Sequence, residues 1–281
     1  MAPRAWKTFP HESAAFDYSG DALKAAWSEL HRGDQEPFPD VDFVETAFAR
    51  RPKLKTGADA AKTAAALQSA WRAYHRGDFE AAVKEGAALG PIGANPANKA
   101  AAIYAAYLEE DSEAKKRVLL AAIERAEELQ AAAPDFVNAF YFHALTLGRY
   151  SQEISIVKAL TQGLGGKINA SLDKALALAP KHAEAHIALG AYNAEVVSKV
   201  GGMLASLTYG ASKEKALQHF QKALELIPDS AIARVEMGSG LVALFGKAKL
   251  AEAQRLYKEA ANCKPADAMQ WLDADFARES A

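Results

Sequence analysis

Cysteine and long apolar runs are the scarcest features of this 281-residue sequence, which contains a single cysteine, Cys263. One thiol cannot form an intrachain disulfide, and it excludes a zinc site built on several cysteines. A chain of this length buries enough apolar surface to fold without either. We therefore interpret Cys263 as a small residue that packs near the end of a helix.

No excess charge of either sign is present, because 33 lysines and arginines are balanced by 35 aspartates and glutamates. Nucleic-acid binding depends mainly on neutralising phosphates with basic side chains. The sequence has no basic tail or stripe. We therefore expect no nucleic-acid partner.

Apolar runs of membrane-spanning length are missing too, since no stretch of about 18 uninterrupted apolar residues occurs. The first residues, MAPRAWKTFPHESAAF, contain no apolar core of signal-peptide length. The expectation is that no segment spans a membrane. We expect a cytoplasmic location, or a periplasmic one if a signal peptide has been removed.

One short segment occurs twice in the N-terminal third of the chain. Residues 22–36 read ALKAAWSELHRGDQE and residues 66–80 read ALQSAWRAYHRGDFE, with nine identical positions at a constant offset of 44. Both copies carry a tryptophan, Trp27 or Trp71, followed by His-Arg-Gly-Asp. Repeats at such spacing are typical of stacked helical units that share one core.

A second kind of repeat ends in proline. Residues 167–180 and 215–228 agree at six of fourteen positions, including the final proline. The prolines that punctuate the chain in this way are Pro134, Pro180, Pro228 and Pro265. Because proline cannot continue a helix, each one predicts the end of one helical unit and the start of the next.

Between the prolines, apolar residues recur at steps of three and four, as in residues 118–129 and 216–227. This spacing gives an α-helix one buried stripe. Alternation of the kind found in β-strands is almost absent. The sequence therefore predicts an all-α protein built from tandem helix pairs.

One of these units resembles the tetratricopeptide repeat. The resemblance rests on AEAHIALG at 183–190, on GDFEAA at 77–82, and on Ala216, Phe220, Ala223 and Pro228. It implies a right-handed α-solenoid in which Gly190 lies where paired helices cross closely, with Leu189 and Phe220 beside it. The proline spacings of 46, 48 and 37 exceed the regular repeat. We therefore expect irregular helix pairs, in which the helices of the middle two units are longer or are joined by longer loops, at 163–166 and 196–210.

A narrower likeness covers residues 165–275. It rests on Lys167-Ile168, on Lys174-Ala-Leu, on LGAY at 189–192, and on LTYGASKEKALQHF at 207–220. In these segments the chain is similar to the regulator-of-microtubule-dynamics family and to the periplasmic T component of tripartite ATP-independent transporters. The resemblance implies a shared architecture more strongly than a shared function.

The first 56 residues are less regular, because prolines interrupt the chain around two expected helices, near residues 19–32 and 40–50. We expect residues 1–56 to form an N-terminal arm or helical cap that carries a degenerate repeat. Residues 57–281 are then the tetratricopeptide-like helical-repeat domain.

The first helix of each pair lines the concave surface of such an array. This register predicts nine partner-binding residues: Trp71, Tyr74, His75, Asn138, Tyr141, Arg149, Glu184, Ile187 and Glu195. Tryptophan, tyrosine and arginine commonly anchor interfaces, although each aromatic residue has a place in the core as its alternative. With no catalytic motif in the chain, the sequence favours a non-enzymatic scaffold that binds a peptide or protein partner without a cofactor.

Two alternatives stay open for the middle of the chain. Residues 196–209 are apolar and split by glycines, so they are either a buried helix extension, which we favour, or an exposed patch for self-association or an apolar ligand. The long insertions also suggest a small-molecule or lipid pocket, as in the transporter component. Under that hypothesis the protein binds a ligand and not a peptide.

His182 and His186 are four residues apart, and this spacing can hold a metal ion on one helix face. No third ligand lies nearby in the sequence, although His143 and His219 come close if the helices stack. The alternative is that these histidines pack or face solvent. We assign no metal site and no active site.

Overall fold

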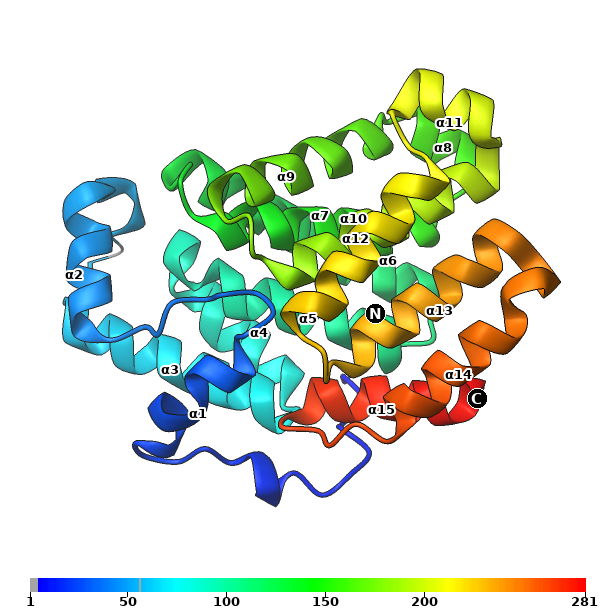
Figure 1. The fold of residues 1–281 in the computed structure, drawn as a ribbon. Helices are drawn as coiled ribbons and strands as arrows, with labels where there is room; N and C mark the ends of the chain where they lie inside the picture. The colour runs from blue at the N-terminus through cyan, green and yellow to red at the C-terminus, as the bar shows by residue number, and fades with distance from the viewer. Residues whose placement is uncertain (1–4, 56) are drawn as a thin grey trace. The chain divides into compact units, whose positions relative to one another are not determined.

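The structure is a computed structural model that describes residues 5–55 and 57–281, and every regular element in these ranges is helical (Figure 1). The all-α prediction is confirmed. The chain forms two compact units: unit 1 is Met1–Leu30 with Glu36–Leu164, and unit 2 is His31–Gln35 with Gly165–Ala281. Within the described ranges, no helix combines the length and hydropathy needed to cross a bilayer. The division at residue 56 and the right-handed sense of the solenoid stay predictions.

Unit 1 is a double layer of helices. Its helices are α1 (Ala22–Leu30), α2 (Val41–Arg50), α3 (Ala60–Arg76), α4 (Phe79–Ala88), α5 (Ala94–Tyr107), α6 (Ser112–Ala132), α7 (Val137–Gln152) and α8 (Ile156–Thr161). Helices α3 to α7 each pack on the next one along the chain, and α5 also contacts both α3 and α7. The helices α3, α5 and α7 therefore form one layer, with α4 and α6 behind them.

Unit 2 repeats this arrangement with longer connections. Its helices are α9 (Leu164–Leu178), α10 (Ala183–Val200), α11 (Gly202–Tyr209), α12 (Lys213–Leu226), α13 (Ala231–Phe245), α14 (Leu250–Ala261) and α15 (Ala268–Ser280). Helix α10 packs on α12 and α13, and α13 packs on α14 and α15. Figure 1 shows α12, α13 and α14 as successive antiparallel rods.

Local sequence sets most helix ends. A side chain at the N-cap accepts a hydrogen bond from the backbone N–H three residues later, and it thereby satisfies a donor that the helix leaves unpaired. The residues that do so are Asp40, Asp59, Asp111, His182, Ser212, Ser230 and Asp267. The four predicted proline stops are confirmed, because each proline lies in the gap between two consecutive helices.

The two copies of the His-Arg-Gly-Asp repeat take different structures beyond the turn. After Asp78 the chain continues directly into α4, whereas after Asp34 it has no regular secondary structure until α2 begins at Val41. The second copy continues with Phe79-Glu80, while the first reaches Pro37 and Pro39, whose missing N–H groups do not support a helix. The expected helices near 19–32 and 40–50 are present as α1 and α2.

The loops expected in the middle of the chain are mostly helical. Gly163, with φ +63°, turns the chain after α8, but Gly165 and Gly166 lie inside α9. Residues 196–210 comprise the end of α10 and the whole of α11. Gly201, with φ +81°, separates these two helices. The expectation of long loops was wrong, because single glycines with positive φ suffice to redirect the helices.

The core of unit 2 depends on a large ring held between small residues. Phe220 on α12 is fully buried. A Cβ atom placed on Gly190 of α10 or on Gly240 of α13 would lie 2.6 Å from its ring. Burying such a ring stabilises the fold by roughly 1.5–3 kcal/mol, and it does so only because both facing residues lack a side chain. The predicted contact between Gly190 and Phe220 is confirmed.

Gly190→Ala is therefore expected to destabilise the protein by about 1–3 kcal/mol, because the new methyl group overpacks a rigid ring. Gly166→Ala is the matched control in the same unit, since nothing lies within 4 Å of its Cβ position. This control is expected to stabilise α9 by about 0.5–1 kcal/mol. Urea denaturation measures both values, and equal effects of the two substitutions would contradict the close crossing.

Candidate functional site

Helices α3, α5 and α7 present a row of polar and aromatic side chains from unit 1. We call this row, consisting of Tyr74, Asn95, Lys99, Asn138 and Phe142, the α3–α5–α7 face. Asn95 and Lys99 are four residues apart on α5, as are Asn138 and Phe142 on α7, so each pair shares one side of its helix. All five side chains are buried, the polar ones included. Burial of three polar side chains requires partners for their polar atoms.

The carboxylate of Glu36 supplies such a partner. Nδ2 of Asn95 donates to Oε1 and Oε2 of Glu36 at 3.0 and 2.9 Å, and Nδ2 of Asn138 donates to Oε2 at 2.6 Å. Glu36 itself is only half-buried. One carboxylate thus joins two helices that are not consecutive in the chain, through hydrogen bonds of the stronger, charge-assisted kind.

Lys99 places a positive charge on the same face. Its side chain is 2% exposed, and its Nζ lies 5.6 Å from the centre of the Tyr74 ring and 5.9 Å from that of Phe142. Cations over aromatic faces are attracted by the ring quadrupole. The face therefore combines two amide donors with a buried cation, and this set suits a carboxylate.

The chain that carries Glu36 lies extended over this part of unit 1. We call residues 36–40 the arm segment. Nε1 of Trp27 donates to the Glu36 carbonyl at 2.7 Å, and Nε2 of Gln68 donates to the Pro39 carbonyl at 2.9 Å. The Phe38 ring meets the Trp27 ring edge-on, with centroids 5.1 Å apart. Side chains of the repeat helices and of α1 therefore hold both the backbone and the side chains of the arm segment.

The aromatic residues predicted on α3 lie beneath the N-terminal arm. Trp71, Tyr74 and His75 are at most 1% exposed. The Trp71 ring meets that of Trp27 edge-on at 5.8 Å, and the ring of Tyr18 meets that of His75 at 6.1 Å. Their burial favours the alternative that these residues are part of the core. Partner binding by Trp71, Tyr74 and His75 stays a prediction.

The predicted residues on α7 have three different surroundings. Asn138 binds Glu36 as described, and Tyr141 is buried with its ring 5.0 Å from that of Phe142. Arg149 is half-exposed near the end of the helix. Asn138 thus shares the Glu36 carboxylate with Asn95 of α5, while Arg149 lies about three turns away along the helix.

The predicted residues on α10 lie in unit 2. Glu184 is half-buried, and its backbone N–H donates to the Gly33 carbonyl at 3.0 Å. Ile187 is buried in a cluster with Ala183, Ala223 and Ile227, and Glu195 pairs with Lys199 at 2.5 Å. Ile187 is therefore a core residue in this conformation. A binding role for these three residues stays a prediction.

Four residues that take part in these contacts were not predicted from the sequence: Glu36, Gln68, Asn95 and Lys99. A usable signal was present for α5, because Asn95 and Lys99 are polar residues at helical spacing in ANPANKAAAIYAAY, which is otherwise mostly apolar apart from Asn98. No local pattern marks Glu36, which lies in an irregular segment between prolines. Its partners are 59 and 102 residues away in the sequence.

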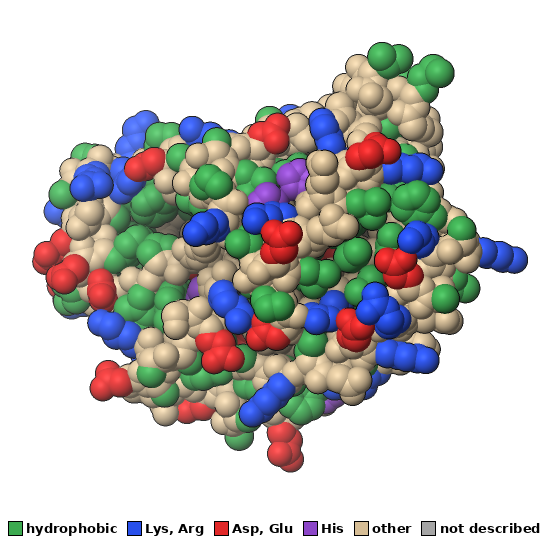
Figure 2. Space-filling view, in the orientation of Figure 1, with side chains coloured by type: hydrophobic (Ala, Val, Ile, Leu, Met, Phe, Trp, Pro, Cys, Tyr) green, Lys and Arg blue, Asp and Glu red, His purple; other side chains and the backbone are tan. Residues whose placement is uncertain are grey.

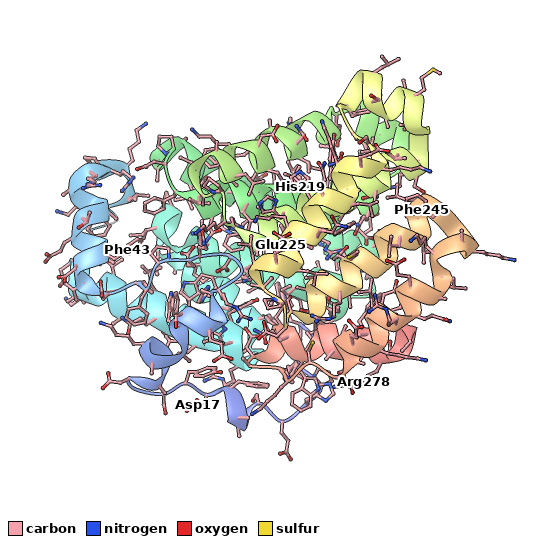
Figure 3. The ribbon with its side chains drawn as sticks, in the orientation of Figure 1. Asp17, Phe43, His219, Glu225, Phe245 and Arg278 are labelled. Carbon is pink, nitrogen blue, oxygen red and sulfur yellow. The ribbon has the colours of Figure 1, made fainter. Side chains whose placement is uncertain are left out.

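The histidines of unit 2 do not form the hypothesised pair. His182 caps α10, where its Nδ1 accepts from the Ala185 N–H at 2.9 Å. His186 instead contacts His219 of α12, the histidine labelled in Figure 3. The two Nδ1 atoms are 2.8 Å apart, and Nε2 of His186 lies 3.1 Å from the Pro180 carbonyl. In the part of the chain that the structure describes, no three histidine, cysteine, aspartate or glutamate side chains are arranged to hold a metal ion.

This contact determines which nitrogen of each histidine ring carries the proton. Nε2 of His186 must donate to the Pro180 carbonyl, so its Nδ1 accepts from Nδ1–H of His219. Burial lowers the pKa of His186, and Lys222 lowers it further. Burial, then His186 and Lys215, lowers the pKa of His219 to about 4. Both rings are therefore neutral in the folded protein near neutral pH.

Helix α11 exposes apolar side chains. Met203 and Leu207 are 82% and 81% exposed and lie four residues apart, while Ala205 on the opposite side is fully buried. Figure 2 shows hydrophobic side chains at the surface in the upper right corner, where Figure 1 places α11. The favoured interpretation of 196–209 as buried was therefore wrong for α11, because the turn at Gly201 directs its apolar face outward.

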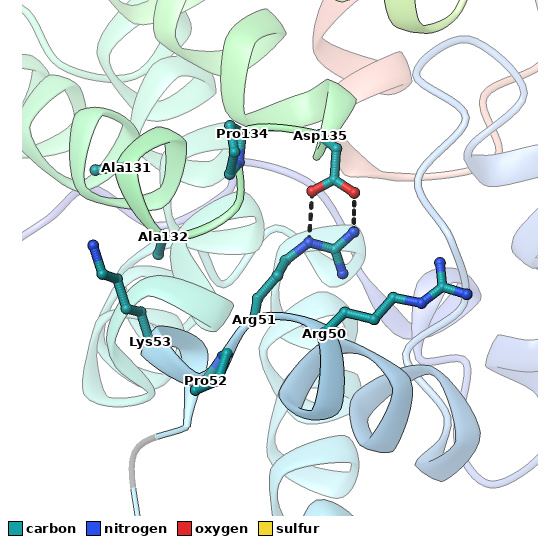
Figure 4. A pocket seen from close by; sticks show the side chains of 8 residues that line it. All are labelled: Arg50, Arg51, Pro52, Lys53, Ala131, Ala132, Pro134 and Asp135. Atoms are coloured by element: carbon teal, nitrogen blue, oxygen red, sulfur yellow. Dashed lines mark hydrogen bonds and ion pairs between the residues drawn. The ribbon is translucent and has the colours of Figure 1, made fainter.

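A surface pocket of about 360 Å³ lies in unit 1 between the end of α2 and the start of α7 (Figure 4). Its lining includes Arg50, Lys53 and the ion pair of Arg51 with Asp135. Arg51 donates from Nε to Oδ1 at 2.6 Å and from a second nitrogen to Oδ2. These hydrogen bonds hold the pKa of Asp135 below its ordinary value. The pair joins α2 to α7 and leaves Arg50 and Lys53 at the rim.

Known proteins match this chain in sequence and in fold. The sequence profile of regulator of microtubule dynamics protein 1-3 matches residues 97–278.

The chain is similar to a thermophilic TPR protein of Thermus thermophilus, with a TM-score of 0.54 and 16% identity over 77% of this chain and 99% of that one. The MamA protein gives a TM-score of 0.39 at 16% identity, over 70% of this chain and 89% of that one. No curated protein matches the sequence. The first structural likeness confirms the tetratricopeptide-like fold.

The neutral histidine pair predicts a pH dependence of stability. The unfolded chain, with histidine pKa values near 6.5, binds more protons than the folded chain at lower pH. The contribution of the pair to stability is therefore complete above about pH 6.5, and it is lost as the pH falls toward about 4.

His219→Gln is expected to reduce this loss. The measurement is the free energy of unfolding by urea at pH 7.5 and at pH 5 for both proteins. The data at pH 7.5 serve as the control, because both rings are then neutral in either state. If the wild type and the variant lose equal stability between the two pH values, the pair does not carry the effect.

Proposed function

We propose that this chain, which belongs to the regulator of microtubule dynamics protein 1-3 family, is a non-enzymatic scaffold that binds a peptide or protein partner on the concave side of its repeats. Its tetratricopeptide-like fold supports a protein-interaction role in general terms. The near-neutral net charge of −2 agrees with a protein partner better than with a nucleic acid.

One observation carries the proposal. The α3–α5–α7 face already holds an extended segment of polypeptide, through side chains of three helices that bind its backbone and its carboxylate. Helices that can bind a stretch of their own chain in this way have the donors and the spacing to bind a stretch of another.

The test is site-specific photocrosslinking of the full chain in an extract of its own cells. A photoreactive amino acid replaces Arg149 on α7, which is half-exposed on the predicted binding layer, or Glu124 on α6, which is exposed on the opposite layer. Because the partner is expected to contact the first layer only, a discrete crosslinked protein should form from position 149 and not from position 124. Identical products from the two positions, or none from either, would contradict binding on this side.

Self-association through residues 196–210 is a second part of the proposal. Helix α11 contains no charged residue and exposes Met203, Leu204 and Leu207 to more than half of their area. Exposed apolar patches of this kind mark interaction sites. A second copy of the same helix offers a matching surface, since a two-fold interface brings equal patches together.

Met203→Ser combined with Leu207→Ser is expected to abolish this association, because it removes the apolar area that drives it. Sedimentation velocity over a concentration series measures the effect. Leu250→Ser is the matched control, since Leu250 is another exposed leucine of unit 2, at 43% exposure. A wild-type protein that stays monomeric at all concentrations would remove this part of the proposal.

A small-molecule or lipid ligand for the middle helices is the alternative function. It is favoured by Tyr192 on α10, whose buried hydroxyl has no hydrogen-bond partner among the described residues. Burial, and to a smaller extent the neighbouring Tyr209 and Asp173, raise the pKa of Tyr192 to about 12. A polar group of a ligand would satisfy this hydroxyl, which otherwise remains unpaired at a cost of about 1–3 kcal/mol.

A further inference from the structure

The arm segment lies on the surface although the groups that bind it are buried. Glu36 and Phe38 are half-buried and Pro37 is exposed, while Pro39 is buried. Beneath them Asn95, Lys99 and Asn138 are 6%, 2% and 3% exposed. A segment needed only for core packing would bury apolar side chains against apolar neighbours. Here a partly exposed carboxylate occupies a preformed polar site.

The site has binding capacity that the arm segment does not use. Oδ1 of Asn95 is buried and accepts no hydrogen bond from any residue that the structure describes. Such an acceptor matches a backbone N–H of a bound peptide, and the next turn of α5 adds the charge of Lys99. The acceptor thus fits the main chain of a peptide, whereas the amide donors of Asn95 and Asn138 and the nearby cation select a carboxylate on it.

The residue that precedes the arm segment has an unfavourable backbone conformation. Gln35, directly before Glu36, has φ +52°, in the left-handed region that residues with a side chain rarely adopt. A peptide in solution is free of the turn that forces this conformation. A separate peptide with the same contacts would therefore bind without this strain.

We propose that the α3–α5–α7 face, together with Trp27 of α1 and Gln68 of α3, is a recognition site for a segment of a partner protein that carries a glutamate followed by proline and an aromatic residue, and that Glu36-Pro37-Phe38-Pro39 occupies this site in the absence of the partner. The inference rests on the proposed scaffold function and names the chemistry of its ligand. The arm segment acts as a tethered competitor, whose effective concentration is in the millimolar range for a short connection. A partner must displace it.

The test measures binding of a fluorescein-labelled peptide GDQEPFPDV, which copies residues 33–41, to the full-length protein by fluorescence anisotropy. A second peptide, GDQQPFPDV, replaces the glutamate by glutamine and keeps its shape. Because the carboxylate accepts three hydrogen bonds from the face, the first peptide is expected to bind about tenfold more tightly or better.

Glu36→Ala is expected to bind the first peptide at least about tenfold more tightly than the wild type, because the tethered competitor is weakened. Glu45→Ala is the matched control, since Glu45 is an exposed acid on the adjoining helix α2, and it should leave the affinity unchanged. Adding Asn138→Ala to Glu36→Ala should reduce the preference for glutamate, because one of the three hydrogen bonds to the carboxylate is lost while Asn95 still donates. Phe38→Ala loosens the arm segment by another route and is expected to tighten binding as well.

Several outcomes would overturn the inference. The first is equal affinity for the two peptides, which is measurable in the wild type even if a variant fails to fold, because the competitor weakens both peptides alike. The second is a folded Glu36→Ala or Phe38→Ala protein that binds no more tightly than the wild type. Wild-type dimers that dissociate on Glu36→Ala substitution would identify a second copy of the chain as the occupant and would contradict a separate partner.

The result also separates this inference from the proposed function. Discrete crosslinks from position 149 without a preference between the peptides would leave the scaffold function standing and remove the glutamate-binding site. A peptide preference without crosslinks would establish the glutamate-binding site and contradict the proposed function, the binding of a cellular partner on this side.

Discussion

Close approach of neighbouring helices is the constraint on which this fold depends. In unit 2 the Phe220 ring fills the space that Gly190 and Gly240 leave open, and it ties three helices together. In unit 1 a Cβ atom on Gly86 would lie 2.7 Å from the Gly93 carbonyl and 3.0 Å from the Ala97 side chain, so the approach to α5 is equally tight. Packing at this density leaves no room for even one added methyl group.

The α3–α5–α7 face is a consequence of this packing. A carboxylate has two oxygens and reaches only about 3 Å to each donor. Asn95 and Asn138 can share Glu36 only because α5 and α7 contact each other directly. The alanines that bring the helices together have no polar atoms of their own. The few polar residues among them therefore converge on one group.

The two units use their polar residues differently. In unit 1 buried amides and a lysine surround a carboxylate from the N-terminal arm. In unit 2 the polar contact between two packed helices is that of His186 with His219. Both rings are neutral, so this hydrogen bond is not charge-assisted. The apolar face of α11 is a third kind of surface on the same repeat architecture. Repeat folds tolerate such variety because each unit packs only on its neighbours.

Much of the architecture follows from local sequence. The helix ends could be predicted because proline and the capping residues act on backbone groups within a few positions of themselves. The contact of Gly190 with Phe220 was also predictable, because the repeat pattern carries it. The burial of α11 was predicted wrongly, since composition alone does not tell which way a helix turns after a glycine such as Gly201.

By itself the sequence determined the class of fold, the number of punctuating prolines and the pairing of small with large residues. These properties depend on periodicity and on the chemistry of single residues, which are readable along the chain. Only the tertiary structure decided that Glu36 meets Asn138, 102 positions away, and that Trp71 and His75 lie beneath the arm. The reason is that such contacts depend on how the arm crosses the packed helices, and no residue near Glu36 in the sequence specifies that path.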